Sequence, residues 1–184
     1  NKSLLTATNL GGVAFSADGD LMVVAADGVI QVRAVPSGQW LRNVPLTSRR
    51  YVPFALAPHG DLLVTAEVAD GTITIWNART GERVAGMSNA TARVLAWSND
   101  SRRLASAGDD TTIHIWEAKT GREERSCSAT ARILALAFAP DGRTLAVGTV
   151  GKDIQLLDAT TGSVQRTLQT EGPYFYRLTF SPDG

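Results

Sequence analysis

The hydrophobic and polar positions of the chain recur with a period of about 41 residues. A large apolar residue stands at five equivalent positions, Phe15, Leu56, Trp97, Phe138 and Phe180. Three residues after each of them begins a short turn, which is Asp-Gly in three of the five units. A glycine marks a second phase of the same period, at Gly38, Gly81, Gly121 and Gly162. Because two independent landmarks keep one step, the sequence predicts tandem structural repeats.

Each repeat contains short segments separated by turns, and no part of the chain shows the 3.6-residue periodicity of a long helix. In the fourth unit, strands are predicted over residues 133–138, 144–148, 154–158 and 163–168. The first of these is the most apolar and the last is the least, so we expect burial to fall from an inner to an outer edge. The pattern therefore predicts an all-β fold of four-stranded sheets arranged radially about an axis.

Two units carry a further pair of motifs, an Asp six residues before a Trp and a Thr-Gly turn after it. The first pair is Asp70 with Trp76, and the second is Asp110 with Trp116. With these motifs on a 41-residue repeat, the chain resembles the WD-repeat family of β-propellers. The resemblance implies antiparallel four-stranded blades, and it implies structural roles for Asp70, Trp76, Asp110, Ser106 and Trp116.

The sequence departs from the family pattern at two kinds of position. The family's His before the first strand would fall at Thr6, Ser88, Ala129 and Glu171, and none of these is His. The family's Asp-His-Ser/Thr-Trp hydrogen-bond chain, of which Asp110, Ser106 and Trp116 could supply three members, therefore lacks one partner. The first and fourth units also replace the Trp with Arg33 and Leu157. We interpret the chain as a degenerate set of repeats.

The period divides residues 1–184 into four whole blades and two part-blades. Residues 1–8 are predicted to be the outer strand of a preceding blade and residues 174–184 the inner strand of a following one. The four blades are predicted at 9–49, 50–90, 91–131 and 132–173. The resemblance implies a ring of seven or eight blades. Three arrangements stay open: a portion of a longer propeller chain, two copies joined into an eight-bladed ring, or an unusual closure of four blades.

Composition narrows the class of protein. Hydrophobic residues make up 43% and charged residues 20%, which is typical of a chain that buries a core. No stretch approaches the roughly 18 consecutive apolar residues of a spanning helix, so no membrane partner is expected. Eighteen Lys and Arg balance eighteen Asp and Glu, so the broad positive field of a dedicated nucleic-acid binder is absent. We expect a cytoplasmic protein, and the excess of Arg over Lys favours a bacterial source.

The sequence carries no recognisable enzymatic motif. It lacks both standard glycine-rich phosphate loops, His-Glu-x-x-His, a cysteine pair and Gly-x-Ser-x-Gly. The single cysteine, Cys127, cannot form an internal disulfide, and His59 and His114 lie in different repeats. Asp109 and Asp110 resemble a carboxylate pair, but Asp110 stands where the family uses an Asp to tie a turn. We therefore expect no catalytic residue, no metal and no cofactor.

Positions six and four residues before the periodic apolar residue enter the first strand of each blade and share one side. The resemblance implies that this rim, together with the turn carrying Asp109, forms the face on which partners bind. A basic and aromatic set falls there: Arg50, Arg93, Arg132, Tyr174 and Tyr176. Guanidinium groups suit an acidic or phosphorylated protein segment. The alternative is that these are ordinary surface arginines.

Two functions of different class remain. The first is a non-catalytic scaffold or sensor module for protein interaction, attached to an effector or signalling domain outside this sequence. Its partners would be a protein or peptide, together with the missing blades supplied by the same chain or by a second copy. The second is a propeller enzyme or small-ligand binder that uses the central channel. The second would need titratable residues on the inner strands, which carry mainly Ala, Leu, Val and Phe.

Overall fold

The computed structural model describes residues 10–26, 29–44, 46, 52–59, 61–67, 70–87, 92–171 and 177–184. These residues form sixteen β-strands and no helix, so the described part of the chain contains no helix able to cross a bilayer. Each consecutive group of four strands makes one antiparallel sheet in simple sequential order. The all-β class and the four-stranded antiparallel blades predicted from the repeat are confirmed.

The strands follow the predicted units closely. The first sheet contains β1 (Leu10–Phe15), β2 (Leu21–Ala26), β3 (Val29–Ala34) and β4 (Trp40–Val44). The second contains β5 (Phe54–Leu56), β6 (Leu62–Glu67), β7 (Thr72–Asn77) and β8 (Arg83–Met87). The third contains β9 (Val94–Trp97), β10 (Arg103–Ala107), β11 (Thr112–Glu117) and β12 (Glu123–Ser128). The fourth contains β13 (Ile133–Phe138), β14 (Thr144–Thr149), β15 (Asp153–Asp158) and β16 (Val164–Gln169).

In the turn after the first strand, side chains form hydrogen bonds with backbone N–H groups that have no partner in the strand ladder. In the β9–β10 turn, the Ser98 hydroxyl accepts a hydrogen bond from the Arg103 backbone N–H at 2.9 Å and donates one to Asp100 Oδ1 at 2.7 Å. Asp100 Oδ1 also accepts the Arg102 backbone N–H at 3.0 Å. Asp and Ser favour such local turn geometry because their short polar side chains reach nearby backbone groups. The same Ser–Asp pair, Ser16 with Asp18, closes the β1–β2 turn, so these polar pairs set where the first strand ends in the first and third sheets.

Apolar packing occurs between consecutive sheets. One cluster joins the first and second sheets, with Val23 and Val32 on one side and Leu63 on the other. A second joins Ile73 and Ile75 of the second sheet to Leu104 and Trp116 of the third. A third cluster joins the third and fourth sheets and includes Ile113, Ile115, Leu145, Val147 and Leu157. Each sheet thus covers one apolar face of its neighbour.

The outer strands are solvated as predicted, but burial does not peak at the inner strand. Strands β12 and β16 are exposed along almost their whole length. Strands β6, β10 and β14, the second of each sheet, are nearly fully buried, whereas β5 is only half-buried. The second strand has a hydrogen-bonded neighbour on both sides, while the inner strand has a free edge toward the centre. The expected steady fall from inner to outer edge is therefore wrong at its inner end.

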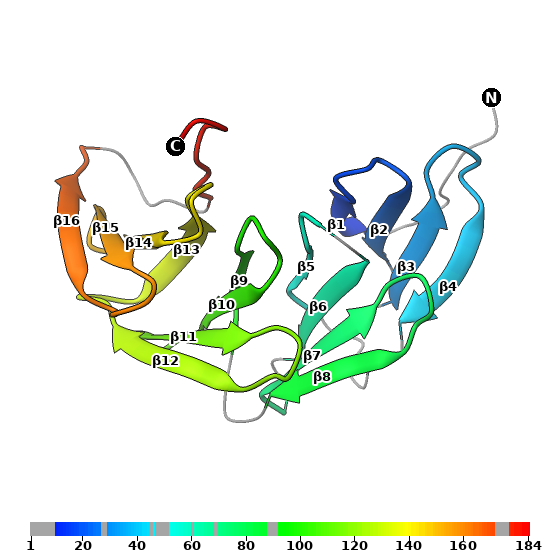
Figure 1. The fold of residues 1–184 in the computed structure, drawn as a ribbon, viewed down its shortest axis with the longest axis horizontal. Helices are drawn as coiled ribbons and strands as arrows, with labels where there is room; N and C mark the ends of the chain where they lie inside the picture. Colours follow the sequence, from blue (N-terminus) through cyan, green and yellow to red (C-terminus); the bar gives the residue numbers. More distant parts are fainter. Residues whose placement is uncertain are drawn as a thin grey trace.

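The four sheets form an open arc with their first strands toward the hollow side and their fourth strands outside (Figure 1). The described parts of the first and fourth sheets lie at opposite ends of this arc and do not meet. Val13 and Phe15 lie on the face of the first sheet turned away from the second and are 44% and 58% exposed. The ring is incomplete, and Val13 and Phe15 are left exposed on this face of the first sheet.

Of the two predicted part-blades, only the second falls partly within the described residues. Residues 1–8 lie outside the described residues, as do residues 174–176. Among residues 177–184 no strand is assigned, because no described segment pairs with them in a ladder. Their predicted terminal turn is present, with the Gly184 backbone N–H donating to the Ser181 carbonyl at 3.0 Å.

Candidate interaction surface

Three charged side chains meet where the third and fourth sheets adjoin. Arg93 directly precedes β9, Arg132 directly precedes β13, and Asp109 lies in the turn between β10 and β11. Arg93 Nε lies 2.6 Å from Asp109 Oδ2, and Arg132 Nη2 lies 3.1 Å from Asp109 Oδ1. About half of each side chain is exposed. Two arginines from adjacent blades therefore converge on one carboxylate at the surface.

Backbone hydrogen bonds fix the positions of both arginines. The Arg93 backbone N–H donates to the Ala107 carbonyl at 2.8 Å, which extends the β9–β10 pairing by one residue. The Arg132 carbonyl accepts the Val150 N–H at 2.9 Å, which does the same between β13 and β14. Each guanidinium thus starts from a backbone position held by its own sheet, and the spacing of the two sheets sets the distance between them.

The arginines hold Asp109 in its charged form. The hydrogen bond from Arg93, followed by the positive charges of Arg93 and Arg132, lowers the pKa of Asp109 below its ordinary value. A guanidinium has five N–H donors. The contacts to Asp109 use Nε of Arg93 and Nη2 of Arg132, and the half-exposed side chains leave other donors facing solvent. The cluster can therefore accept a second anionic group without losing the first.

The remaining predicted rim residues, Arg50, Tyr174 and Tyr176, lie outside the described residues. The structure brings together Arg93, Arg132 and Asp109 of the predicted set. Asp110, beside Asp109, has a different role, because its Oδ1 accepts the Thr112 backbone N–H at 3.1 Å and so ties the start of β11.

The residues expected to have structural roles make hydrogen bonds within their own blades. Trp116 Nε1 donates to the buried Ser106 hydroxyl at 2.8 Å. Trp76 makes the equivalent bond to Thr65 Oγ1 at 2.9 Å. Asp70 Oδ1 accepts both the backbone N–H and the hydroxyl of Thr72, and the hydroxyl contact is the main cause that lowers the pKa of Asp70.

Thr65 was missed by sequence reasoning, although it lies 41 residues before Ser106. Applying the 41-residue period to the Ser106 hydroxyl, as well as to Trp116, would have predicted Thr65 as the acceptor for Trp76.

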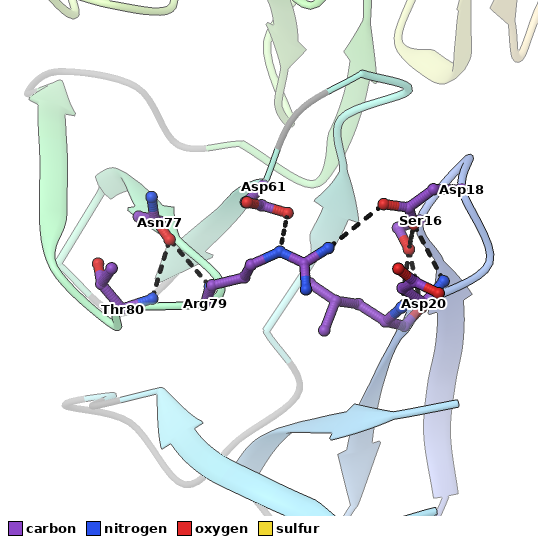
Figure 2. Close-up of polar contacts among 8 residues, drawn as sticks. Ser16, Asp18, Asp20, Asp61, Asn77, Arg79 and Thr80 are labelled. Carbon is purple, nitrogen blue, oxygen red and sulfur yellow. Dashed lines mark hydrogen bonds and ion pairs between the residues drawn. The ribbon is translucent and has the colours of Figure 1, made fainter. Parts of the chain in front are cut away.

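A second polar cluster joins the first two sheets, at the end of the blades opposite to the end that carries Asp109 (Figure 2). Arg79, in the β7–β8 turn, contacts Asp61 Oδ1 through Nε at 2.7 Å and Asp18 Oδ2 through Nη2 at 3.3 Å. Asn77 Oδ1 accepts the backbone N–H groups of Arg79 and Thr80, each at 2.9 Å, and so shapes the turn. The hydrogen bond and charge of Asp61 raise the pKa of Arg79. Sequence reasoning missed this link, which joins turns of two blades.

The histidines and the cysteine serve packing and local contacts. His114 stacks on Trp116 with ring centroids 5.4 Å apart, and its Nδ1 lies 3.0 Å from Glu123 Oε1. His59 is exposed, and its backbone N–H donates to Ser101 of the next blade at 2.7 Å. Burial raises the pKa of the half-buried Cys127 thiol. In the part of the chain that the structure describes, no three His, Cys, Asp or Glu side chains are grouped to hold a metal.

The hollow side of the arc contains a cavity of about 480 Å³ against β9, β13 and residues 177–182. Side chains of the two inner strands form one part of its wall, and residues 177–182 form another. Arg177 is the one charged residue among those that line it. Among the described residues that line this cavity there is no acid–base pair.

Comparison with known proteins agrees with this architecture. Residues 54–77 and 86–117 match the family described as WD domain, G-beta repeat. Residues 123–182 match the family described as Anaphase-promoting complex subunit 4 WD40 domain. The two matched families cover the last three of the four sheets.

Two curated relatives are WD-type or periodic-tryptophan proteins of eukaryotes. The chain is 30% identical over 125 residues to WD repeat-containing protein SL1-17 of Schistosoma mansoni, covering 66% of this chain and 41% of that protein. It is 29% identical over 127 residues to Periodic tryptophan protein 2 of Arabidopsis thaliana, covering 67% of this chain and 14% of that protein. The chain thus spans less than half of either relative. Repeat period, blade topology and these matches together place the chain in the WD-repeat family.

Proposed function

We propose that this chain is a non-catalytic scaffold that binds an acidic or phosphorylated protein segment at Arg93, Asp109 and Arg132. The observation that carries the proposal is the convergence of two half-exposed arginines, each anchored by a different blade, on one carboxylate. The sheets hold the backbones of the two arginines at a fixed spacing, so a partner has only their side chains to order.

The chemistry favours a carboxylate or phosphate ligand. Arginine forms paired, charge-assisted hydrogen bonds to such groups because its planar fork matches their oxygens. Asp109 competes for the same donors, but exposed ion pairs contribute only about 0.2–1 kcal/mol. A partner anion can share or replace the Asp109 contacts at small cost. The effect of Asp109 is to disfavour weak single anions and to favour segments with several negative charges.

The test is a binding titration with two labelled peptides. One alternates glutamate and glycine, and the other carries two phosphoserines in the same frame. Arg93→Ala with Arg132→Ala is expected to weaken binding by about tenfold or more, which corresponds to about 1.4 kcal/mol. The melting temperature should stay unchanged because both side chains are half-exposed.

The matched control removes two exposed arginines, Arg102 and Arg122, from turns at the other end of the third sheet. Arg102→Ala with Arg122→Ala keeps the same net charge change and should leave binding within about twofold. Equal losses in both double variants would show a general charge effect and would remove the rim from consideration. The two peptides separate carboxylate from phosphate recognition.

We also propose that the scaffold is part of a larger assembly that includes other domains and further blades. A scaffold or sensor module attached to an effector or signalling domain fits the longer length of the curated relatives. Completion of the ring by further blades of the same chain, or by a second copy, fits the exposure of Val13 and Phe15 on the first sheet. A cytoplasmic location and a bacterial source stay predictions, and the two relatives are eukaryotic.

A further inference from the structure

A buried carboxylate lies at the start of β15 in the fourth sheet. Asp153 is 9% exposed, and the side chains around it, Thr149 and Gln155, are 0% and 2% exposed. The ion pairs found among the described residues do not include Asp153. A buried carboxylate without a cation needs hydrogen bonds on both oxygens.

Two hydroxyl groups supply those bonds. Thr149 Oγ1 donates to Asp153 Oδ1, and Thr130 Oγ1 donates to Asp153 Oδ2 at 3.1 Å. Each hydroxyl in turn accepts an N–H: Thr149 from the Gly151 backbone at 3.1 Å, and Thr130 from Gln155 Nε2 at 3.1 Å. Chains of this kind strengthen one another because each donor is polarised by the next.

The direction of the bonds around Thr130 follows from its single proton. That proton goes to Asp153 Oδ2, so Thr130 must accept from the Gln155 amide. The other amide atom, Gln155 Oε1, is buried without a hydrogen-bond partner in the described structure. The donation to Thr130 is therefore the side-chain hydrogen bond that Gln155 makes among the described residues.

This network occupies the blade that lacks the Trp bond of its neighbours. In the third sheet Trp116 reaches Ser106, whereas the fourth sheet has Leu157 at the position of the Trp. Leu157 is fully buried and offers no donor. The polar contacts of the fourth blade are made instead around Asp153.

Thr130 is the member of the network that leaves the fourth sheet. It belongs to the connection between β12 and β13, whose first residue, Ala129, donates its N–H to the Thr111 carbonyl at 2.8 Å. The last residue of this connection is Arg132, whose carbonyl accepts the Val150 N–H. The hydrogen bond from Thr130 to Asp153 therefore holds the connection at a point between its hydrogen bond to the third sheet, at Ala129, and its hydrogen bond to the fourth sheet, at Arg132.

We infer that Asp153 is a positioning residue for the binding surface: through Thr130 it fixes the β12–β13 connection and so holds Arg132 against Asp109. This inference rests on the proposed function, because it assigns to Asp153 an effect on binding that passes through Arg132. Asp153 itself is buried and does not touch the partner.

The experiment is a double-mutant cycle between Asp153→Asn and Arg132→Ala, read by binding of the phosphoserine peptide. Asp153→Asn alone should weaken binding about fivefold, equivalent to about 1 kcal/mol. In the Arg132→Ala background, Asp153→Asn should not weaken binding further, because both substitutions remove the same contact between Arg132 and the peptide. Equal weakening with and without Arg132, or no weakening at all, would overturn the inference.

Two further variants complete the cycle. Thr130→Val keeps the carboxylate and removes one hydroxyl, so it tests the same path if Asp153→Asn does not fold. Asp158→Asn is the matched control, because Asp158 accepts the N–H groups of Thr160 and Thr161 in the same sheet without touching the connection. Binding by the Asp158→Asn protein should equal that of the unchanged protein, and a loss equal to that of Asp153→Asn would contradict a path through Thr130.

Hydrogen exchange separates failure of the inference from failure of the proposed function. Asp153→Asn should speed exchange at the Ala129 and Val150 amides while the central β13–β14 amides keep their protection. Unchanged exchange at Ala129 and Val150 overturns the positioning role, whatever the peptide does. If Arg132→Ala leaves peptide binding intact, the proposed function fails, and exchange alone then decides whether Asp153 holds the connection.

Discussion

Removing one buried side chain between two blades tests whether stability resides in the packing of sheet on sheet. Leu104 in β10 is fully buried and belongs to the apolar cluster shared by the second and third sheets. Within its own sheet it lies opposite Trp97 on one side and Trp116 on the other. Two rigid indole rings limit the collapse of any space left there, so Leu104→Ala should leave a cavity.

The magnitude follows from the atoms removed. Leu104→Ala deletes three carbon groups, worth about 0.8 kcal/mol each, and the unfilled cavity adds to that. We expect the free energy of unfolding to fall by about 3–4 kcal/mol. Val164→Ala is the control, because Val164 is 49% exposed on the outer strand β16 and should lose less than about 0.7 kcal/mol.

Urea denaturation followed by tryptophan fluorescence measures both variants. The midpoint should shift strongly for Leu104→Ala with little change in the denaturant slope. A loss below about 1 kcal/mol, or a loss equal to that of Val164→Ala, would refute the packing between the second and third sheets.

Two further changes probe the turns. Gly121 has φ +71°, and a Cβ there would lie 3.0 Å from the Gly86 carbonyl oxygen of the neighbouring blade, whereas Gly19 has φ +75° and open space around it. Gly121→Ala should therefore lower the melting temperature more than Gly19→Ala, which carries only the backbone strain of about 1–2 kcal/mol; equal shifts would contradict the close approach of the blades. Acid should also destabilise the protein, because the Ser98 hydroxyl lowers the pKa of Asp100 and the Arg143 and Thr144 N–H groups lower that of Asp141. The stabilisation from these two carboxylates is fully present above the unfolded pKa of about 3.9, and it is lost as the pH falls through their lower folded pKa values. Asp100→Asn should therefore make the free energy of unfolding fall less steeply in this pH range. An unaltered slope would contradict the role given to Asp100.

The repeat made the fold predictable from the sequence. In the fourth unit the predicted strands match β13–β16 to within one residue at each end, because apolar alternation and the Asp-Gly turn mark both boundaries. The polar outer strands were also predicted correctly. The first strand of each blade was expected to be the most buried, but Val13 in β1 is 44% exposed, because its face meets no described sheet. A pattern along one chain shows which face is apolar, but it does not show what covers that face.

The candidate site was predictable in part. The repeat placed Arg93 and Arg132 at the entry to the first strands of neighbouring blades, and each directly precedes such a strand. Their shared contact with Asp109 was not predicted, because it depends on side-chain reach between separate blades. The links made by Arg79 were missed for the same reason.

The motif did not predict a role for Asp153, because Asp153 lies two residues after the position of the family's Asp. Asp70 and Asp110 lie six residues before a Trp, and the corresponding position in the fourth unit is Gly151. Its partner Thr130 lies one residue beyond the position where the family has His. A network that forms with shifted residues leaves no mark at the positions that a repeat alignment compares.

The most direct test of the account is a crystal structure of the protein with the phosphoserine peptide bound. The account predicts fanned four-stranded sheets and a phosphate within hydrogen-bond distance of the Arg93 and Arg132 guanidinium groups, where the third and fourth sheets meet. A peptide bound in the central hollow with both arginines still engaged only by Asp109, or sheets stacked as a sandwich, would contradict it.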